Sequence, residues 1–121
     1  MARAHTTSAG TDDLQAFKAA FFKALAHPTR IKLLECLVRE DQTVQELQGA
    51  LGVGQSVVSQ QLAILRATNV VVGRKEGVSV RYAVRDPLIA DLLAIARQIF
   101  NNHLVSTRGL LQQLKYEHRG R

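Results

Sequence analysis

The sequence predicts a mainly α-helical domain that carries one small β-hairpin. Apolar residues recur every three or four positions over most of the chain, which is the spacing of helices with one buried face. After Asn69 the period changes to two around a pair of glycines, which is typical of a hairpin. With 121 residues and 46% hydrophobic content, the chain is long enough for one domain with a small core.

A first helix is expected from residue 11 to about residue 26, with Thr11 or Asp12 as its cap. Its apolar positions are Leu14, Phe17, Phe21 and Leu25. A helix this apolar near a terminus must be covered by its own domain or by a second chain. Residues 1–10 are small and polar, so we expect a disordered arm there.

His27-Pro28 separates the first helix from the second, because proline disfavours a helical residue before it and suits the first position of a new helix. The second helix should run from Pro28 to about Arg39. Its expected buried residues are Ile31, Leu34, Leu37 and Val38, with Arg30 and Lys32 on polar faces.

Residues 43–69 predict two short helices joined by a tight turn. Thr43 and Glu46 have capping-box spacing, which fixes the start of the first of these helices. Val44, Leu47 and Leu51 form its apolar face. Gly52 stands where a left-handed C-terminal glycine is expected.

The second helix of this pair has an inward face formed by Val58, Leu62 and Leu65. Its N-terminal end and opposite side carry short amides and hydroxyls, which read base edges and phosphates when a helix enters a major groove. These residues are Gln55, Ser56, Ser59, Gln60 and Gln61. A helix-turn-helix is therefore the natural hypothesis. The alternative for Gln61 is an amide of the helix surface without contact to DNA.

After Asn69, which can end the helix in a left-handed conformation, residues 70–82 predict two short strands and a glycine-containing turn. Arg74, Lys75 and Arg81 lie on or beside this hairpin. A basic hairpin directly after a candidate recognition helix indicates a winged helix whose wing reaches DNA phosphates. The alternative is an exposed edge hairpin that uses charge to prevent aggregation. Adjacency to the motif favours the wing.

Asp86 and Pro87 predict the cap and first position of a long last helix that could reach Lys115, with a possible kink at residues 106–109. Its main apolar stripe is Leu88, Leu92, Ile95 and Ile99. Such a surface exceeds what a small domain covers alone. Together with Leu14, Phe17 and Phe21, it predicts a homodimer interface. Residues 11–115 would then form the DNA-binding and dimerisation domain, followed by a basic tail at 116–121.

Charge and composition limit the function classes. Sixteen Lys and Arg against ten Asp and Glu give a net charge of +6, which favours a polyanionic partner. The alternative is a soluble basic protein whose charge only prevents association. The single cysteine excludes an internal disulfide and suggests a cytoplasmic setting. We find no signal-peptide pattern, no apolar run of membrane-spanning length and no motif of an enzyme active site.

Three segments resemble the ArsR/SmtB family of winged-helix repressors: FKALAHPTRIKLLECL, SVVSQQLAILRATNVV and GRKEGVSVRYAV. They match the family's Leu-Ala/Gly-x-Pro-x-Arg, Ser-x-x-Ser-x-His-Leu and Arg-x-Gly-x-x-x-Tyr patterns, and the resemblance covers residues 17 to about 100. Gln61 replaces the usual histidine of the recognition helix, which changes what that position can donate and accept.

The resemblance implies a homodimer that binds a roughly palindromic operator in double-stranded DNA and blocks transcription until an inducer loosens it. Two recognition helices would then enter successive major grooves about 34 Å apart. The five amides and hydroxyls named above would be the groove contacts. Arg66, Arg74, Lys75 and Arg81 would lie on phosphates, the alternative for Arg66 being a solvated or intramolecular charge.

The family's metal sites are not reproduced in this sequence. Thr43 and Gln45 occupy the positions of the Cys-x-Cys pair that binds thiophilic metals in some relatives. For the site on the last helix only Asp86 remains, because the other positions hold Leu88, Ile99 and Asn102. We therefore predict no metal and no cofactor, and the effector stays unknown.

The histidines and the cysteine are weak candidates for sensing. His5, His27, His103 and His118 have more ordinary structural or exposed interpretations, although a cross-subunit site using His103 stays open. Some relatives respond to oxidants through two cysteines, one of them in the second helix. Cys36 is alone, and we interpret it as an inert small residue of the core.

Two other functions are compatible with this sequence. One is an effector-independent DNA-binding or architectural protein. The other is a winged-helix module for contacts with another protein, against which the basic wing and the Gln/Ser-rich helix argue.

Overall fold

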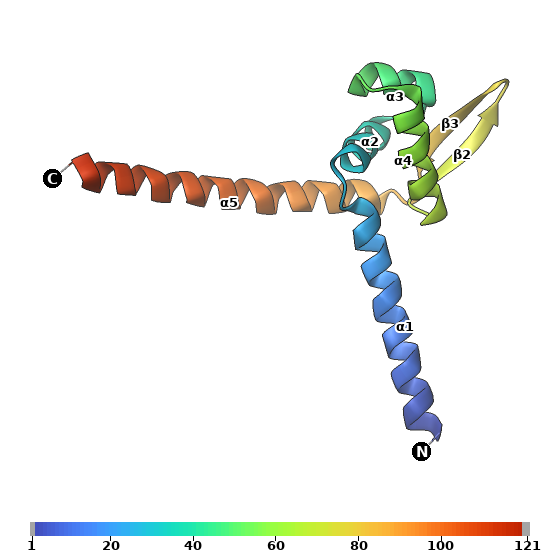
Figure 1. Cartoon of the computed structure of the whole chain (residues 1–121), viewed down its shortest axis with the longest axis horizontal. Helices are drawn as coiled ribbons and strands as arrows, with labels where there is room; N and C mark the ends of the chain where they lie inside the picture. The colour runs from blue at the N-terminus through green and yellow to red at the C-terminus, as the bar shows by residue number, and fades with distance from the viewer. Residues whose placement is uncertain (1, 120–121) are drawn as a thin grey trace. The chain divides into compact units, whose positions relative to one another are not determined.

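The computed structural model describes residues 2–119, in which five helices and three short strands follow one another (Figure 1). In chain order they are α1 (Ala2–Leu25), α2 (Pro28–Arg39), β1 (Gln42–Thr43), α3 (Val44–Leu51), α4 (Gln55–Ala67), β2 (Val71–Glu76), β3 (Ser79–Val84) and α5 (Leu88–Arg119). The chain divides into two compact units, one ending at Pro87 and the other beginning at Leu88. None of the described helices is long and apolar enough to cross a membrane. The mainly helical fold with a small hairpin is as predicted.

The core of the first unit lies among α2, α3, α4 and the start of β2. Its fully buried side chains are Leu33, Leu34, Leu37, Leu47, Val58, Leu62, Leu65, Val70 and Val71. The inward face predicted for α4 is therefore confirmed. Burying these branched aliphatic groups stabilises each by about 1.5–3 kcal/mol relative to exposure, so this core holds the helix-turn-helix in shape.

The prediction for α2 was wrong in part. Leu33 is fully buried, whereas Ile31 is 38% exposed and Val38 is only half-buried. The buried stripe is rotated around the helix relative to the prediction. Arg30, expected on a polar face, is half-buried and lies three positions before Leu33, on the same side of α2. An arginine can occupy this place because its polar head finds acceptors there, while its stem packs as an apolar group.

Local capping sets the ends of these helices, and the caps of α3 are as the sequence predicts. His27 is the N-cap of α2, and its Nδ1 accepts a hydrogen bond from the backbone N–H of Thr29 at 3.2 Å. Thr43 Oγ1 accepts from the N–H of Glu46 at 3.3 Å and begins α3. Gly52 ends α3 with φ 68°, a left-handed conformation that glycine adopts without steric cost. Asn69, at φ 60°, follows the end of α4.

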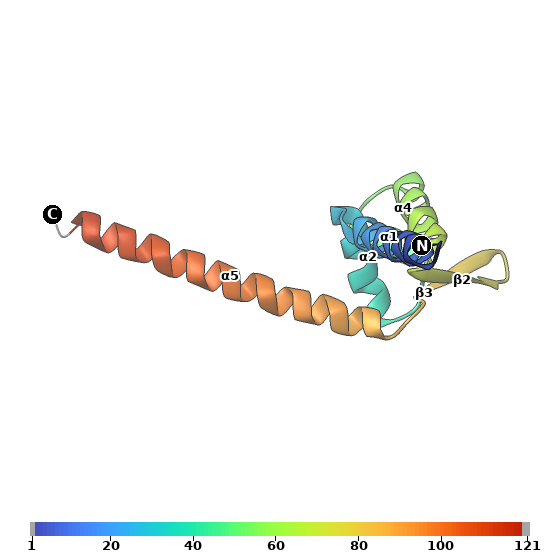
Figure 2. The same cartoon turned by 90° about the horizontal axis from the view of Figure 1, so that it is seen from below.

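The predicted hairpin is present, and it belongs to a three-stranded antiparallel sheet with the order β1-β3-β2. Figure 1 and Figure 2 show β2 and β3 as the hairpin that follows α4. Gly77, with φ 64°, begins its two-residue loop, where hairpin turns favour glycine. We did not predict β1, because two residues are too few to show an alternating pattern.

The two terminal helices are longer than expected. α1 begins at Ala2, so residues 2–10 are helical where the sequence suggests a disordered arm. α5 begins at Leu88, one residue after the predicted first position, and continues to Arg119 without a break at residues 106–109. Most of the large apolar side chains proposed for the dimer interface are exposed, namely Leu14, Phe17, Leu88, Ile95 and Ile99, whereas Phe21 and Leu92 are half-buried.

Candidate nucleic-acid interface

Four of the five predicted groove-contacting residues lie together on the exposed face of α4. Gln55, Ser56, Ser59 and Gln60 are all exposed, and the opposite face of the helix is buried in the core. Gly54 is the N-cap residue of α4 and carries no side chain to cap the first backbone amides. The leading end of α4 thus offers amide, hydroxyl and backbone N–H groups, which are suited to base edges and phosphates.

Gln61, the fifth residue, is not placed with the other four. Its side chain is half-buried, and its Oε1 accepts a hydrogen bond from Nη1 of Arg30 on α2 at 3.0 Å. The oxygen atom of Gln61 is therefore paired within the chain, and the DNA contact expected of Gln61 stays a prediction. The sequence alone does not show this contact, because the two residues are 31 positions apart.

The three basic residues of the hairpin divide into two groups. Arg74 and Lys75, on β2, are exposed. Arg81, on β3, is half-buried and donates hydrogen bonds to Glu76 Oε2 at 2.5 Å, to the backbone oxygen of Asp41 at 3.0 Å and to Glu46 Oε1 at 3.4 Å. Arg81 therefore joins the wing to α3 and to Asp41, directly before β1. Its guanidinium is already paired within the chain, and the phosphate contact expected of Arg81 stays a prediction.

The electrostatics of Arg81 are consistent with its pairing. Its hydrogen bond and charge lower the pKa of the Glu76 carboxyl below the ordinary value. The hydrogen bond that Arg81 donates to Glu76 in turn raises the pKa of the Arg81 guanidinium. Arg81 and Glu76 are thus both charged at neutral pH, and the positive charge available to a ligand is concentrated at Arg74 and Lys75.

A hollow of about 220 Å³ connects the first turn of α4 to the wing. Its lining comes from β1, α3, α4 and the hairpin: Thr43, Val44, Gln45, Gln55, Val78, Ser79, Val80 and Tyr82. The polar groups among them are hydroxyls and amides, and no carboxylate lines the hollow.

Arg66 is exposed in the last turn of α4, at the end of the helix away from Gln55.

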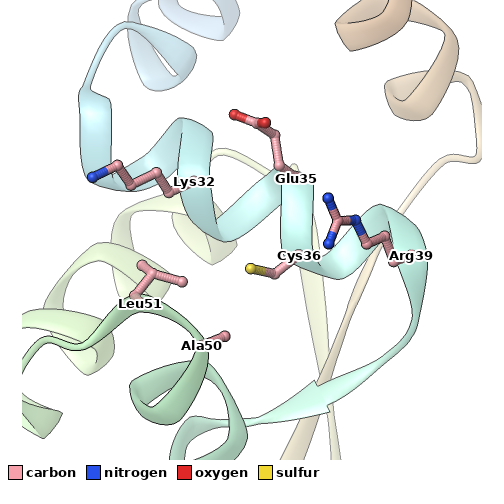
Figure 3. A pocket seen from close by; sticks show the side chains of 6 residues that line it. All are labelled: Lys32, Glu35, Cys36, Arg39, Ala50 and Leu51. Carbon is pink, nitrogen blue, oxygen red and sulfur yellow. The ribbon is translucent and has the colours of Figure 1, made fainter.

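Cys36 is not a residue of the core, which corrects the sequence-based interpretation. It is only half-buried and lines a separate hollow of about 310 Å³ between α2 and α3. Figure 3 shows its sulfur directed toward Ala50 and Leu51, with Lys32 and Arg39 on either side along α2. The thiol is thus reachable from solvent.

The histidines give little support to a metal site. His27 caps α2, and His103 is exposed on α5. The side chains of His5 and His118 lie outside the described residues. Within the described part of the chain, no three His, Cys, Asp or Glu side chains lie close enough together to hold a metal ion.

A helix-turn-helix with an exposed amide-rich face, followed directly by a hairpin with two exposed cations, defines a winged helix-turn-helix DNA-binding protein. Residues 27–72 match the family described as bacterial regulatory protein, arsR family. The chain is also 42% identical over 106 residues to the uncharacterized HTH-type transcriptional regulator Rv0081 of Mycobacterium tuberculosis, covering 87% of this chain and 93% of that protein. This chain belongs to the ArsR family, and the resemblance is confirmed. It is a DNA-binding transcriptional regulator, a class distinct from enzymes.

Other similar proteins agree with this assignment. The probable mercury resistance operon repressor of Streptomyces lividans is 43% identical over 79 residues, covering 65% of this chain and 63% of the repressor. The crystal structure of Rv0081 superposes with a TM-score of 0.72 at 44% identity, covering 78% of this chain and 95% of that one. The solution structure of the homodimeric winged helix-turn-helix domain of Mb0332 from Mycobacterium bovis gives 0.72 at 26% identity, covering 78% and 87%.

Proposed function

We propose that this chain acts as a homodimeric repressor that binds a roughly palindromic operator and is released by an effector still to be identified. The observation that carries the proposal is the surface formed by the exposed face of α4 and the wing cations Arg74 and Lys75. The α4 residues would read base edges, and the two cations would contact phosphates. Such a division of work gives both specificity and salt-dependent affinity.

The terminal helices support the dimer. Phe17 is 72% exposed and Ile99 is 60% exposed, and further large apolar residues follow along α5. Water contact with this many apolar side chains is unfavourable, and a second copy of the chain would remove it. The domain of Mb0332 is described as homodimeric. Two copies related by a twofold axis would present two α4 helices to major grooves about 34 Å apart.

Repression is supported by the relative from Streptomyces lividans, which is named a repressor. We do not infer the effector of this chain from that relative. Thr43 and Gln45, at the family's thiolate positions, line the hollow beside Gln55 and offer no thiolate to a metal.

The proposal is tested by DNA binding measured against salt concentration. The purified chain should shift a fragment of its own promoter region in the presence of excess random DNA. The logarithm of affinity should fall with the logarithm of salt concentration, with a slope of about 0.9 per phosphate contacted. Sedimentation in the same buffer should give the mass of a dimer. A monomer, or equal affinity for promoter and random DNA, contradicts the proposal.

Variants of α4 separate base reading from phosphate contact. Gln60→Ala and Ser59→Ala should weaken binding to the operator, by about 1–3 kcal/mol where a bidentate base contact is lost, and should relax base preference. Gln112→Ala on α5, also exposed, is the matched control and should change neither quantity. Equal loss of specific and random binding in the Gln60 variant would argue against a base-reading role.

A further inference from the structure

One guanidinium connects three helices of the first unit. Nε of Arg30, on α2, donates to the backbone oxygen of Ala24 at 2.6 Å, and Nη2 approaches that of Lys23 at 3.5 Å. Both oxygens belong to the last turn of α1, where carbonyls lack partners within the helix. The Lys23 oxygen also accepts from the backbone N–H of Ala26, directly after the helix, at 3.1 Å. Nη1 of the same side chain donates to Gln61 Oε1 on α4 at 3.0 Å. Arg30 is half-buried, so these contacts are partly shielded from water.

The chemistry of this contact fixes the orientation of the Gln61 amide. An arginine has only donors, so the group facing Nη1 must be the amide oxygen. The NH2 group is then the hydrogen-bonding group that Gln61 keeps for other partners, and it can only donate. Gln61 follows directly after the exposed Gln60, and its side chain is itself partly exposed.

We propose that Arg30 is a positioning residue for DNA recognition, which holds Gln61 so that α4 presents an amide donor to the operator. The inference rests on the proposed function. A fixed donor selects acceptors such as guanine O6 and N7 or thymine O4, and it discriminates against the amino groups of adenine and cytosine. An amide free to rotate would accept or donate equally and would lose this discrimination. Arg30 acts without touching DNA, through Gln61 and through the anchor that the end of α1 provides.

The test is a double-mutant cycle on base preference. Four proteins are compared: wild type, Arg30→Lys, Gln61→Met and the double variant. The probes are a duplex selected by the wild-type protein from a randomised pool and a random-sequence duplex, and the readout is the ratio of the two affinities. Lysine keeps the charge of Arg30 but lacks the planar fork that reaches α1 and α4 together. Met keeps the length of Gln61 and removes its donors.

We expect each single change to lower the affinity ratio about five-fold per half-site, the effect of one hydrogen bond. The double variant should be no worse than Gln61→Met alone, because both changes remove the same contact. Arg39→Lys is the matched control: it makes the same change at an exposed position of α2 and should leave the ratio unaltered. Independent, additive losses in the cycle, or a ratio unchanged in Gln61→Met, would overturn the inference.

A further variant keeps the test decisive if Arg30→Lys unfolds. Gln61→Glu retains an acceptor for Arg30 but has no N–H donor, so the fold should be kept and the affinity ratio should fall at least as far as in Gln61→Met. Preserved base preference in this variant contradicts a donor role. A wild-type protein without any base preference would overturn the proposed function as well, whereas normal wild-type preference with an additive cycle overturns only the role of Arg30.

Discussion

The helix-turn-helix core and the terminal helices contain similar apolar residues in opposite situations. Leu33 and Leu62 are fully buried among α2, α3 and α4, whereas Leu14 is 52% exposed and Ile95 is 56% exposed. The core is completed by the chain itself. The terminal helices have apolar stripes of helical period that a single chain leaves largely in water. An apolar stripe in a sequence therefore predicts a helix face that must be buried. The stripe does not show whether the same chain or a second chain buries that face.

Truncation of a core leucine should have the largest effect on folding. Leu62→Ala removes buried methyl groups from α4 and should lower the free energy of unfolding by about 2–5 kcal/mol. The measurement is urea denaturation followed by circular dichroism. Ile64→Ala, at a position of the same helix that is 38% exposed, is the control and should cost clearly less. Equal losses at both positions would remove the distinction between the core and the surface of α4.

A charge on α5 should act on assembly instead. Ile95→Glu is expected to keep the helical content of the chain while releasing monomers, because a carboxylate cannot be buried in an apolar interface without a partner. Loss of the second half-site contact should weaken operator binding by about 10²-fold or more. Ile95 suits this test better than Phe21 or Leu92, which are half-buried in the single chain and serve in further variants.

Sedimentation together with a DNA shift assay measures both effects of Ile95→Glu. Gln98→Glu places the same charge at an exposed polar position of α5 and should stay dimeric. An Ile95→Glu protein that remains dimeric would place the interface elsewhere, and the comparison between the core and the terminal helices would then need another explanation for the exposed stripe.

The sequence predicts most of this fold because its signals are local. The capping residues Thr43 and Gly52, the inward face of α4 and the glycine turn of the hairpin each depend on residues a few positions apart. Strand β1 was missed because its existence depends on pairing with β3, about 40 positions away, rather than on its own two residues. Tertiary pairing of this kind leaves no periodic trace in a short segment.

The position of the candidate site can be predicted from the sequence. The sequence does not show which of its polar groups are available for DNA and which are paired within the chain. All of the proposed contacts lie on α4 and the hairpin, as expected from the motif. Charge in the sequence does not reveal that Arg81 is held by Glu76 and Glu46, nor that Gln61 is bound by Arg30. These three partners come from other elements or from across the hairpin, so only the folded chain separates the exposed cations from those already paired.

The difference between the exposed and the paired cations of the wing predicts a smaller effect. Lys75→Ala should weaken binding to specific and random DNA about equally and reduce the salt slope by about 0.9 per half-site. Arg81→Gln should leave that slope nearly unchanged, because its guanidinium is already bound to carboxylates. Affinities measured by fluorescence anisotropy over a range of salt concentrations test both variants. An equal reduction of slope in the two variants would show that Arg81 also reaches phosphates.

The smallest expected effect concerns the pH dependence of the Glu76–Arg81 ion pair, which joins the two strands of the wing. Because Arg81 lowers the pKa of the Glu76 carboxyl, this pair contributes stability above the ordinary pKa of glutamate and loses it as the pH falls through the lowered value. The pairing of Glu76 with Arg81 across the hairpin should therefore be unchanged from neutral to mildly acidic pH and weaken only in more acidic solution. Carboxyl NMR titration of Glu76 should give a midpoint that rises to the ordinary value in Arg81→Gln. A midpoint that is the same in both proteins would mean that Arg81 and Glu76 are not paired in solution. Arg81 would then be a cation available for DNA, like Arg74 and Lys75.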